Sequence, residues 1–224
     1  MCFNNVLTSK TTDVTSITFP KLNGVPEGSN LLNYCFGHLK INTAATEGIT
    51  FNLYDTKIPK NCFNGSNIKT LNVSKDLSEI QDGAFKDCTL LDAIKPIGAN
   101  TFNSLSYIGE NCFNNTALRE KDTTNKHWYA IVGNKRVYID SIEGENSTIV
   151  SPECDLVAKY AVRPEVTDIT CAFVGNKRIH KEALLESKLL FIFKNNVFNL
   201  KKLTLETREG ETIKLYSEGF HPAL

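Results

Sequence analysis

The sequence predicts a β-rich solenoid, in which short strands, turns and 3-10 segments repeat along the chain and little helix forms. Two patterns of apolar residues carry this prediction. The first places an aliphatic residue four positions before a small residue that is followed by Phe, and the second spaces three aliphatic residues as L-x-x-L-x-L. A unit of 22–28 residues cannot bury its own apolar face, so the units must stack around a continuous interior.

The first pattern is Ile-x-x-x-small-Phe-x-x-small-x-aliphatic. It begins at Ile58, and further copies begin at Ile80 and Ile108, at steps of 22 and 28 residues. A copy that matches four of the five positions begins at Leu31, 27 residues before Ile58. The small positions should be crowded, and they hold Cys35, Cys62, Ala84, Cys112, Ser66, Cys88 and Thr116.

The second pattern marks the strands. It begins at Val14, Ile68, Val166 and Leu200, and we place a further strand start at Ile41, midway between the first two. The series continues at Leu90 and Leu118. Because strand side chains alternate between two faces, the aliphatic positions should point inward. We expect burial of Ile68, Leu71, Val73, Phe63 and Phe85, and exposure of Lys69, Thr70 and Asn72.

Two segments resemble the halves of a BspA-type leucine-rich repeat, which read L-x-x-I-x-I-P and I-x-x-x-A-F-x-x-C. They are Val14–Pro20 (Val-Thr-Ser-Ile-Thr-Phe-Pro) and Ile80–Cys88 (Ile-Gln-Asp-Gly-Ala-Phe-Lys-Asp-Cys). The chain departs from the family where Ala161-Val162 replaces the small-Phe pair and where the Pro after the strand is absent. The resemblance implies a leucine-rich-repeat solenoid, an α/β-type right-handed superhelix, together with surface display and adhesion.

We expect a single solenoid over residues 1–224. Its parts are the clearest repeats at 14–119, a polar insertion with a hairpin at 120–145, degenerate repeats at 146–206 and a C-terminal cap at 207–224. Leu203–Leu205 and Thr212–Tyr216 predict a hairpin that closes the last coil.

The insertion should begin with a polar loop at 120–126 and continue as a β-hairpin formed by Trp128–Val132 and Val137–Ile139. The string Val-Gly-Asn-Lys-Arg occurs at 132–136 and again at 174–178. These are either two structurally equivalent turns or a matched pair of basic recognition turns. The composition of His180–Leu190 favours one short helix.

The seven cysteines are an odd number and include no C-x-x-C pair, so neither a disulfide framework nor a zinc site is indicated. Five of them fall on repeat positions and should be buried thiols: Cys35, Cys62, Cys88, Cys112 and Cys171. Asparagines cluster around the Phe residues, where we expect them to serve turns, because Asn tolerates left-handed backbone conformations.

The amino-acid composition bears on whether the chain folds and on whether it binds nucleic acid, spans a membrane or is exported. Hydrophobic residues make up 41% and charged residues 22%, which is typical of a folded domain. The 25 basic and 25 acidic residues give zero net charge, which argues against a nucleic-acid partner. The longest apolar run, Leu189–Phe193, is too short to span a membrane. Residues 1–20 show no signal peptide, so either the protein is intracellular or an export signal lies outside this sequence.

Nothing in the sequence indicates catalysis. The four histidines lie outside any metal or catalytic frame, and no phosphate-binding, dinucleotide or nucleophile-elbow motif occurs. We therefore predict no catalytic, cofactor-binding or metal-binding residue. A carboxylate pair brought together from distant positions, as in a glycosidase, is a third alternative.

The favoured hypothesis is a non-catalytic, monomeric binding module, secreted or displayed at a cell surface, with a protein or glycan ligand. The alternative is a cytoplasmic scaffold or assembly subunit. A ligand should lie across several strands, and the outward strand positions that should contact it are Lys69, Thr70, Asn72, Lys201, Lys202 and Thr204. Each of these residues is otherwise simply a solvated strand residue.

Overall fold

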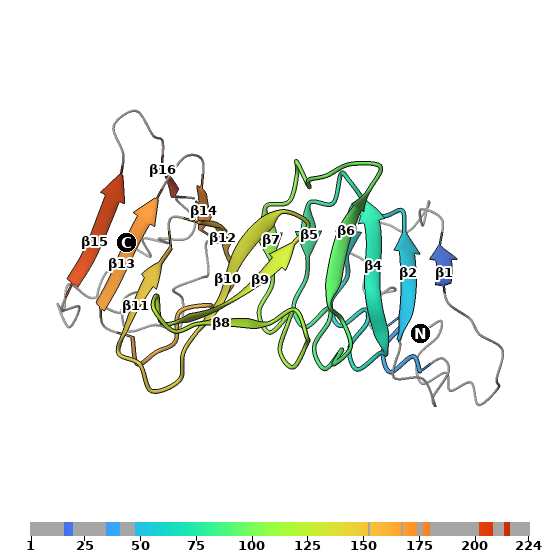
Figure 1. Cartoon of the computed structure of the whole chain (residues 1–224), viewed down its shortest axis with the longest axis horizontal. Coiled ribbons are helices and arrows are strands. Elements are labelled where there is room, and N and C mark those ends of the chain that lie inside the picture. The colour runs from blue at the N-terminus through green and yellow to red at the C-terminus, as the bar shows by residue number, and fades with distance from the viewer. Residues whose placement is uncertain are drawn as a thin grey trace, which may run out of the picture. The chain divides into compact units, whose positions relative to one another are not determined.

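The computed structural model describes residues 16–19, 35–40, 48–151, 153–166, 168–173, 177–179, 202–207 and 213–215, with side chains as far as residue 166. Every regular element in these ranges is a β-strand (Figure 1). The helix expected at His180–Leu190 lies outside the described residues. Within the described part no helix is long and apolar enough to cross a membrane.

The chain divides into two compact units. The first comprises Met1–Leu105, Asn111–Arg119 and Ile131–Asn134, and the second comprises Ser106–Glu110, Glu120–Ala130 and Lys135–Leu224. The single solenoid over 1–224 and its right-handed superhelical path stay predictions.

A parallel four-stranded sheet forms one side of the first unit. Its strands are β1 (Ser16–Phe19), β2 (Ile49–Leu53), β4 (Ile68–Ser74) and β6 (Ala93–Ile97), in that order (Figure 1). Matching apolar positions meet across the strands, because Phe51 pairs with Leu71 and Leu71 pairs with Ile94. On another side of each coil, β3 (Lys57–Ile58) pairs in parallel with β5 (Glu79–Ile80).

The predicted burial of β4 is confirmed at its apolar positions. Ile68, Leu71 and Val73 are buried, and Lys69 between them is exposed. Thr70 and Asn72, which we expected to be exposed, are half-buried. Their lower exposure follows from the sheet, since both side chains lie between those of neighbouring strands.

The strand beside β4 begins at Ile49, whereas the strand start that we expected at Ile41 lies outside the described residues. The spacing of the two strands also differs, because β4 contains a β-bulge. Ile68 pairs with Ile49 and Thr70 pairs with Thr50, so Lys69 is an extra residue in β4. The L-x-x-L spacing of β4 therefore has no counterpart in β2, whose residues alternate strictly. The next strand is also displaced by one residue, since Leu91 is buried and Leu90 is half-exposed.

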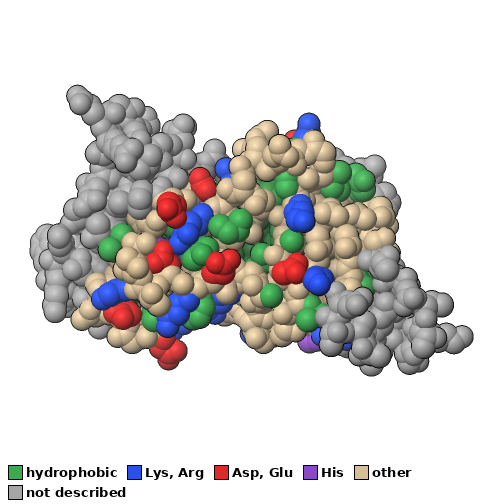
Figure 2. All heavy atoms as spheres, in the orientation of Figure 1, with side chains coloured by type: hydrophobic (Ala, Val, Ile, Leu, Met, Phe, Trp, Pro, Cys, Tyr) green, Lys and Arg blue, Asp and Glu red, His purple; other side chains and the backbone are tan. Residues whose placement is uncertain are grey.

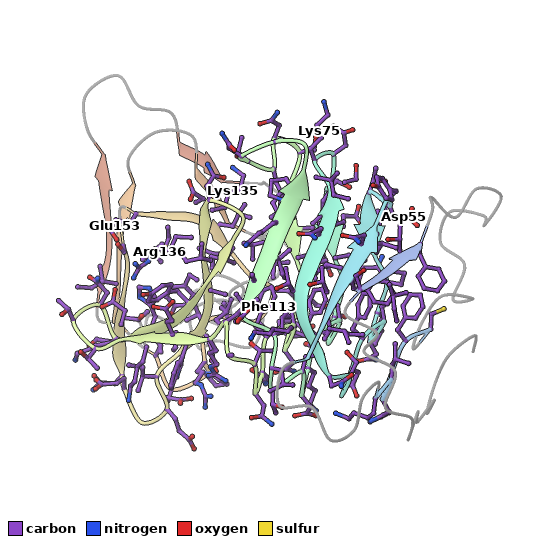
Figure 3. The ribbon with its side chains drawn as sticks, turned by 45° about the vertical axis from the view of Figure 1, so that its right-hand side comes forward. Asp55, Lys75, Phe113, Lys135, Arg136 and Glu153 are labelled. Atoms are coloured by element: carbon purple, nitrogen blue, oxygen red, sulfur yellow. The ribbon has the colours of Figure 1, made fainter. Side chains whose placement is uncertain are left out.

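A ladder of aromatic rings runs through the interior of the first unit. Phe36 stacks on Phe63 at 5.1 Å between ring centroids, Phe63 on Phe85 at 5.5 Å, and Phe85 on Phe113 at 6.0 Å. The interplanar angles of 19°, 9° and 5° show nearly parallel rings, and Figure 3 shows Phe113 among the packed side chains. The predicted repeat register is confirmed.

The small repeat positions do more than fit a crowded interior. The Cys88 thiol donates to the Phe63 carbonyl at 2.9 Å, and the Cys112 thiol donates to the Gln81 carbonyl at 3.0 Å. Burial raises the pKa of Cys88 to about 11, against a weaker opposing effect of hydrogen bonds with Ser66. The thiol therefore stays protonated and able to donate at neutral pH. Cys35 and Cys62 are likewise buried thiols, as predicted.

The turns before the small residues share a left-handed backbone. Asn61, Gly83 and Asn111 each precede a small residue, and their φ angles are 53°, 63° and 55°. Tyr160, with φ 53°, takes the same place before Ala161, so the degenerate copy at Val157–Val162 keeps the turn geometry. This confirms for Asn61 and Asn111 that asparagines beside the Phe residues serve turns.

The second unit contains most of a sheet of six strands. In spatial order these are β16 (Ile213–Leu215), β14 (Lys177–Ile179), β12 (Cys154–Val157), β10 (Lys135–Ser141), β9 (His127–Val132) and β8 (Glu120–Asp122). The predicted β9–β10 hairpin is confirmed. The loop expected at 120–126 is partly wrong, because β8 pairs antiparallel with β9. Cross-strand contacts explain this, since the Tyr129 hydroxyl donates to Glu120.

The C-terminal strands do not form the predicted hairpin. β15 (Lys202–Thr207) pairs in parallel with β13 (Asp168–Phe173), which pairs with β11 (Ser147–Val150), whereas β16 pairs in parallel with β14. Each coil thus contributes one strand to each of two sheets, which continues the repeat. The predicted correspondence of the two strand copies is confirmed in register, as Ile169 pairs with Leu203. The remaining strand, β7 (Tyr107–Ile108), lies beside the chain that follows β12, where Lys159 N–H donates to Ile108.

The ring ladder predicts a local loss of stability. Phe85→Ala should cost roughly 3–5 kcal/mol in the free energy of unfolding, because it empties a buried aromatic site. The loss of amide protection in hydrogen exchange should concentrate in the coils that contain Phe63 and Phe113 and fade by β13, since coils contact mainly their neighbours. The exposed neighbour Lys86→Ala is the control. An equal loss of protection in β4 and β13 would contradict the prediction.

Candidate ligand-binding face

The outward side of the four-stranded sheet is mostly polar. We call it the polar face, and it consists of the side chains that alternate with the buried ones on β1, β2, β4 and β6. These are Ser16, Thr18, Thr50, Asn52, Lys69, Thr70, Asn72, Ser74, Ala93, Lys95 and Ile97, of which Ala93 and Ile97 are apolar. In Figure 2 the area over β2 and β4 is mostly tan, the colour shared by uncharged polar side chains and the backbone, with few charged side chains.

One row across this face is a chain of hydrogen bonds. The strand register aligns Thr18, Asn52, Asn72 and Lys95, one residue from each strand, and we call this the asparagine row. The Asn72 amide donates to Asn52 Oδ1 at 2.8 Å, and the Asn52 amide donates to Thr18 Oγ1 at 3.0 Å. Each amide is therefore held in one orientation, as in the Asn ladders of stacked strands.

A second row carries hydroxyl groups. The same register aligns Ser16, Thr50, Thr70 and Ala93, and we call this the hydroxyl row. The two rows lie two residues apart along each strand, on the same side of the sheet. Together they present donors and acceptors on a surface made from four rigid strands.

The charge on the polar face is positive. Lys69 and Lys95 are both exposed, and no carboxylate occurs among the outward side chains of the four described strands. The bulge places Lys69 close to Gly48, where an added Cβ would lie 2.7 Å from Lys69 Cβ. Gly48 has φ 64°, so both its conformation and its lack of a side chain make room for the bulge. The exposed Asp92 immediately precedes β6.

The candidate ligand contacts predicted from the sequence fall on two different sheets. Lys69, Thr70 and Asn72 lie on β4 of the four-stranded sheet, and Asn72 is already bonded within the asparagine row. Lys202 and Thr204 lie on β15 of the β11–β13–β15 sheet, where side chains are not described, and Lys201 lies outside the described residues. Sequence reasoning missed Thr18, Asn52 and Lys95, although the alternation Ile-Thr-Phe-Asn-Leu at 49–53 marks β2.

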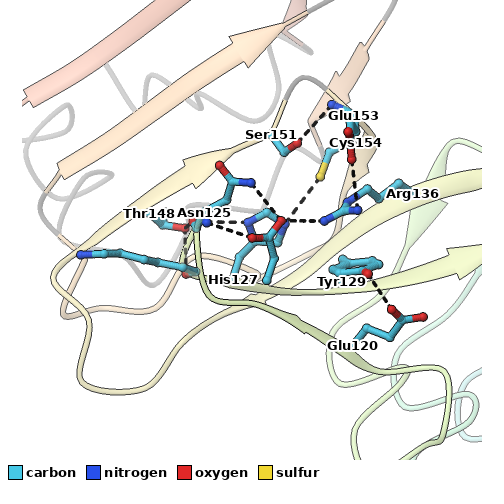
Figure 4. A network of polar contacts seen from close by, with 11 residues as sticks. Glu120, Asn125, His127, Tyr129, Arg136, Thr148, Ser151, Glu153 and Cys154 are labelled. Atoms are coloured by element: carbon cyan, nitrogen blue, oxygen red, sulfur yellow. Dashed lines mark hydrogen bonds and ion pairs between the residues drawn. The ribbon is translucent and has the colours of Figure 1, made fainter.

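The second unit contains a buried cluster of titratable and hydrogen-bonding side chains. His127 is 0% exposed, and its ring lies 4.6 Å from the ring of the equally buried Tyr138. Its Nδ1 lies 3.4 Å from the Asn125 carbonyl and its Nε2 lies 3.8 Å from Cys154 Sγ (Figure 4). This pairing suits the neutral tautomer, in which Nδ1–H donates to the carbonyl and Nε2 accepts from the thiol.

The hydroxyl of Tyr138 is satisfied within the same cluster. It lies 2.8 Å from Ser141 Oγ and 3.0 Å from Thr148 Oγ1. Burial raises the pKa of Tyr138, and the two hydrogen bonds oppose this only in part. The ring is therefore a neutral, fully buried structural group.

Arg136 ties the surrounding strands together. Its guanidinium bonds Asp122 at 2.7 Å and Glu153 at 3.2 Å, and it lies 3.5 Å from the ring centroid of Tyr129 (Figures 3 and 4). Burial would raise the pKa of Asp122, but hydrogen bonds from Asn125 and the positive charge of Arg136 hold that pKa below its usual value. Arg136 therefore connects β8, β9 and β10 with the segment that leads into β12.

The cluster contains a cysteine beside a histidine, the pair that nucleophilic catalysis uses. Both side chains are buried, with exposures of 2% for Cys154 and 0% for His127. A substrate therefore has no route to either atom in this conformation, and the pair acts as packing for the second unit. Within the described residues, no group of three or more His, Cys, Asp and Glu side chains is placed to hold a metal ion.

Comparison with known families gave one result. The model of the BspA type leucine rich repeat region matches residues 5–129, in six copies. Comparison with curated proteins and with solved structures gave no match.

The buried His127 predicts a fold that weakens in mild acid. Burial lowers its pKa, although the Asp122 carboxylate opposes this, so the unfolded chain takes up the proton first. Stability should therefore be full above the unfolded pKa of about 6.5 and fall as the pH drops below it. Urea titrations followed by the fluorescence of Trp128, the one Trp in the chain, measure this slope.

Two variants test whether His127 causes this dependence of the unfolding free energy on pH. In His127→Gln the unfolding free energy should change less between about pH 6.5 and 5, because the titrating ring is absent. Cys154→Ser should keep this dependence, because a hydroxyl still faces Nε2. An equal slope in His127→Gln and the parent protein would show that other groups cause the acid sensitivity.

Proposed function

The chain belongs to the BspA-type leucine-rich-repeat family, and we propose that it is a non-catalytic binding module whose polar face holds a polar partner. The observation that carries this proposal is the asparagine row. Its amides are aligned before any ligand arrives, and pre-aligned groups lose less conformational entropy on binding.

The chemistry of the polar face supports binding over catalysis. The titratable side chains on its described strands are two lysines, Lys69 and Lys95. General acid–base catalysis needs a group that changes protonation at the working pH, and no carboxylate or histidine lies among these outward positions. The protein-interaction role common to leucine-rich repeats and a glycan-binding role both fit such a face.

We propose display at a cell surface or secretion, with a role in adhesion or recognition, on the strength of the family resemblance. The alternative is an intracellular scaffold or assembly subunit. One observation favours this alternative, since Cys35, Cys62, Cys88, Cys112 and Cys154 are buried thiols, and reduced cysteines are usual in the cytosol.

Protease treatment of intact cells of the source organism distinguishes the two locations. A displayed protein should be removed from unbroken cells, whereas a scaffold should survive until the cells are lysed. An immunoblot of the treated cells is the measurement, and a known cytosolic protein serves as the control for lysis. Survival of the chain on intact cells and its absence from the medium would overturn the surface proposal.

A substitution that blocks the polar face tests the binding role itself. Thr70 lies at the centre of the face and is half-buried between its neighbours. Ligands are first identified on an array of glycans and immobilised proteins. Thr70→Arg should weaken the binding of each of them about tenfold or more, a loss of at least about 1.4 kcal/mol in binding free energy. Thr89→Arg is the matched control, because Thr89 is exposed and lies outside the four strands.

The two arginine variants separate the possible outcomes. Selective loss of binding in Thr70→Arg, with an unchanged unfolding midpoint, supports the polar face. Equal binding by both variants would move the site elsewhere, for instance to residues 120–145. Absence of any ligand on the array would count against the binding role.

A further inference from the structure

The spacing of the rows limits what kind of chain can lie along them. Neighbouring strands of a sheet are about 4.8 Å apart, and each strand contributes one group to the asparagine row. An extended polypeptide presents side chains on one side every 6.6–6.8 Å or so, so it falls out of step with the row. A linear chain of sugar rings repeats at close to one strand spacing and carries hydroxyl groups on every ring.

The hydrogen bonds within the asparagine row leave capacity for such a chain. A side-chain amide has two N–H donors and one carbonyl acceptor. Asn72 and Asn52 each use one N–H along the row, so the second N–H of each amide is available to a ligand. The hydroxyls of Thr50 and Thr70 run parallel to them. Sugar hydroxyls, which both donate and accept, match this mixed set.

The outward positions of the four strands hold none of the residue types that most often anchor protein partners. Hot spots of protein interfaces are enriched in Trp, Tyr and Arg and sit in desolvated pockets, and none of these residues is among the outward side chains of the four strands. One aromatic ring lies near the rows, that of Tyr54, which directly follows β2 and is 45% exposed. The face of an aromatic ring carries partial negative charge and suits the C–H groups of a sugar ring.

The two lysines of the polar face favour sugars that carry negative charge. Lys95 ends the asparagine row beside Asn72, and Lys69 projects from the bulge on the neighbouring strand. Both are exposed. The Asp92 N–H donates to the Lys69 carbonyl at 3.0 Å, so the exposed Asp92 carboxylate offsets part of this charge. Two ammonium groups against this neighbouring carboxylate leave the rows positive and favour a ligand that carries negative charge. A carboxylate-bearing ring fulfils this condition within the sugar chain itself.

We propose that the polar face binds a linear acidic polysaccharide, laid along the asparagine row across β1, β2, β4 and β6, with carboxylates of its uronate rings at Lys95 and Lys69. This inference rests on the proposed function and specifies its ligand. The rings bond the amides and hydroxyls of the two rows, and the lysines make the binding depend on salt.

Three polymers of similar length test the inference on the full chain by isothermal titration calorimetry. They are polygalacturonate, an uncharged linear β-glucan and polyglutamate. We expect the parent protein to bind polygalacturonate at least about tenfold more tightly than the other two, with affinity that falls as salt rises.

Two double variants test whether the lysines of the polar face contribute to the binding of polygalacturonate. Lys69→Ala with Lys95→Ala should weaken polygalacturonate binding about tenfold or more at low salt and remove most of its salt dependence. The matched control, Lys60→Ala with Lys86→Ala, changes the same charge at two exposed turn positions and should bind like the parent. Asn72→Ala should weaken binding at all salt concentrations. Its unfolding midpoint is measured alongside, and the exposed lysine pair carries the test if Asn72→Ala fails to fold.

Each contrary result has a distinct meaning. Equal binding to polyglutamate would overturn the inference in favour of an acidic polypeptide, and equal binding to the β-glucan would remove the role of the carboxylates. Equal effects of the two lysine pairs would place the site off the polar face. Failure to bind polygalacturonate, while Thr70→Arg still abolishes binding to another ligand of the array, would overturn this inference and leave the proposed function standing.

Discussion

The alignment of one coil on the next is the constraint on which the first unit depends. Phe63 stacks on Phe85, which stacks on Phe113, and the backbone beside each ring continues the same alignment. The Phe63 N–H donates to the Ala84 carbonyl at 2.8 Å, and the Phe85 N–H donates to the Cys112 carbonyl at 3.1 Å. Rings and backbone therefore fix the same step from coil to coil, and the strands follow from it. Because the interior is packed this way, the outward positions of those strands are also held in line.

The interior of the second unit is filled by different side chains. Ala161-Val162 stands where other coils have a small residue and Phe, and both residues are buried. The largest fully buried side chain of the described part is Tyr138, whose hydroxyl requires partners that Phe does not. Ser141 and Thr148 supply them. The turn geometry survives at Tyr160, so the repeat tolerates the loss of its Phe as long as the interior remains filled and its polar atoms remain bonded.

Much of the first unit could be predicted from sequence, because the residues that define the repeat are the ones that stack. Burial of Phe63, Phe85 and Leu71 followed from spacing alone. The tail could not be predicted, since two strands separated by a short polar turn are typical of a hairpin, and only the presence of two parallel sheets assigns β15 and β16 to different ones. The candidate site was found in part. Asn72 was visible as an outward position, but its alignment with Asn52 depends on register across strands, which a single sequence does not display.

The bulge at Lys69 links the interior to the polar face. Ile49 and Phe51 are two residues apart, whereas their partners Ile68 and Leu71 are three apart, and all four side chains are buried. One residue of β4 must therefore leave the pairing, or every later side chain would change face. The residue that does so is Lys69, which is exposed and faces a glycine at position 48. The same adjustment that keeps Leu71 and Val73 inside brings Asn72 opposite Asn52 and places a positive charge beside the rows. The composition of the polar face is thus a consequence of how the core is kept in register.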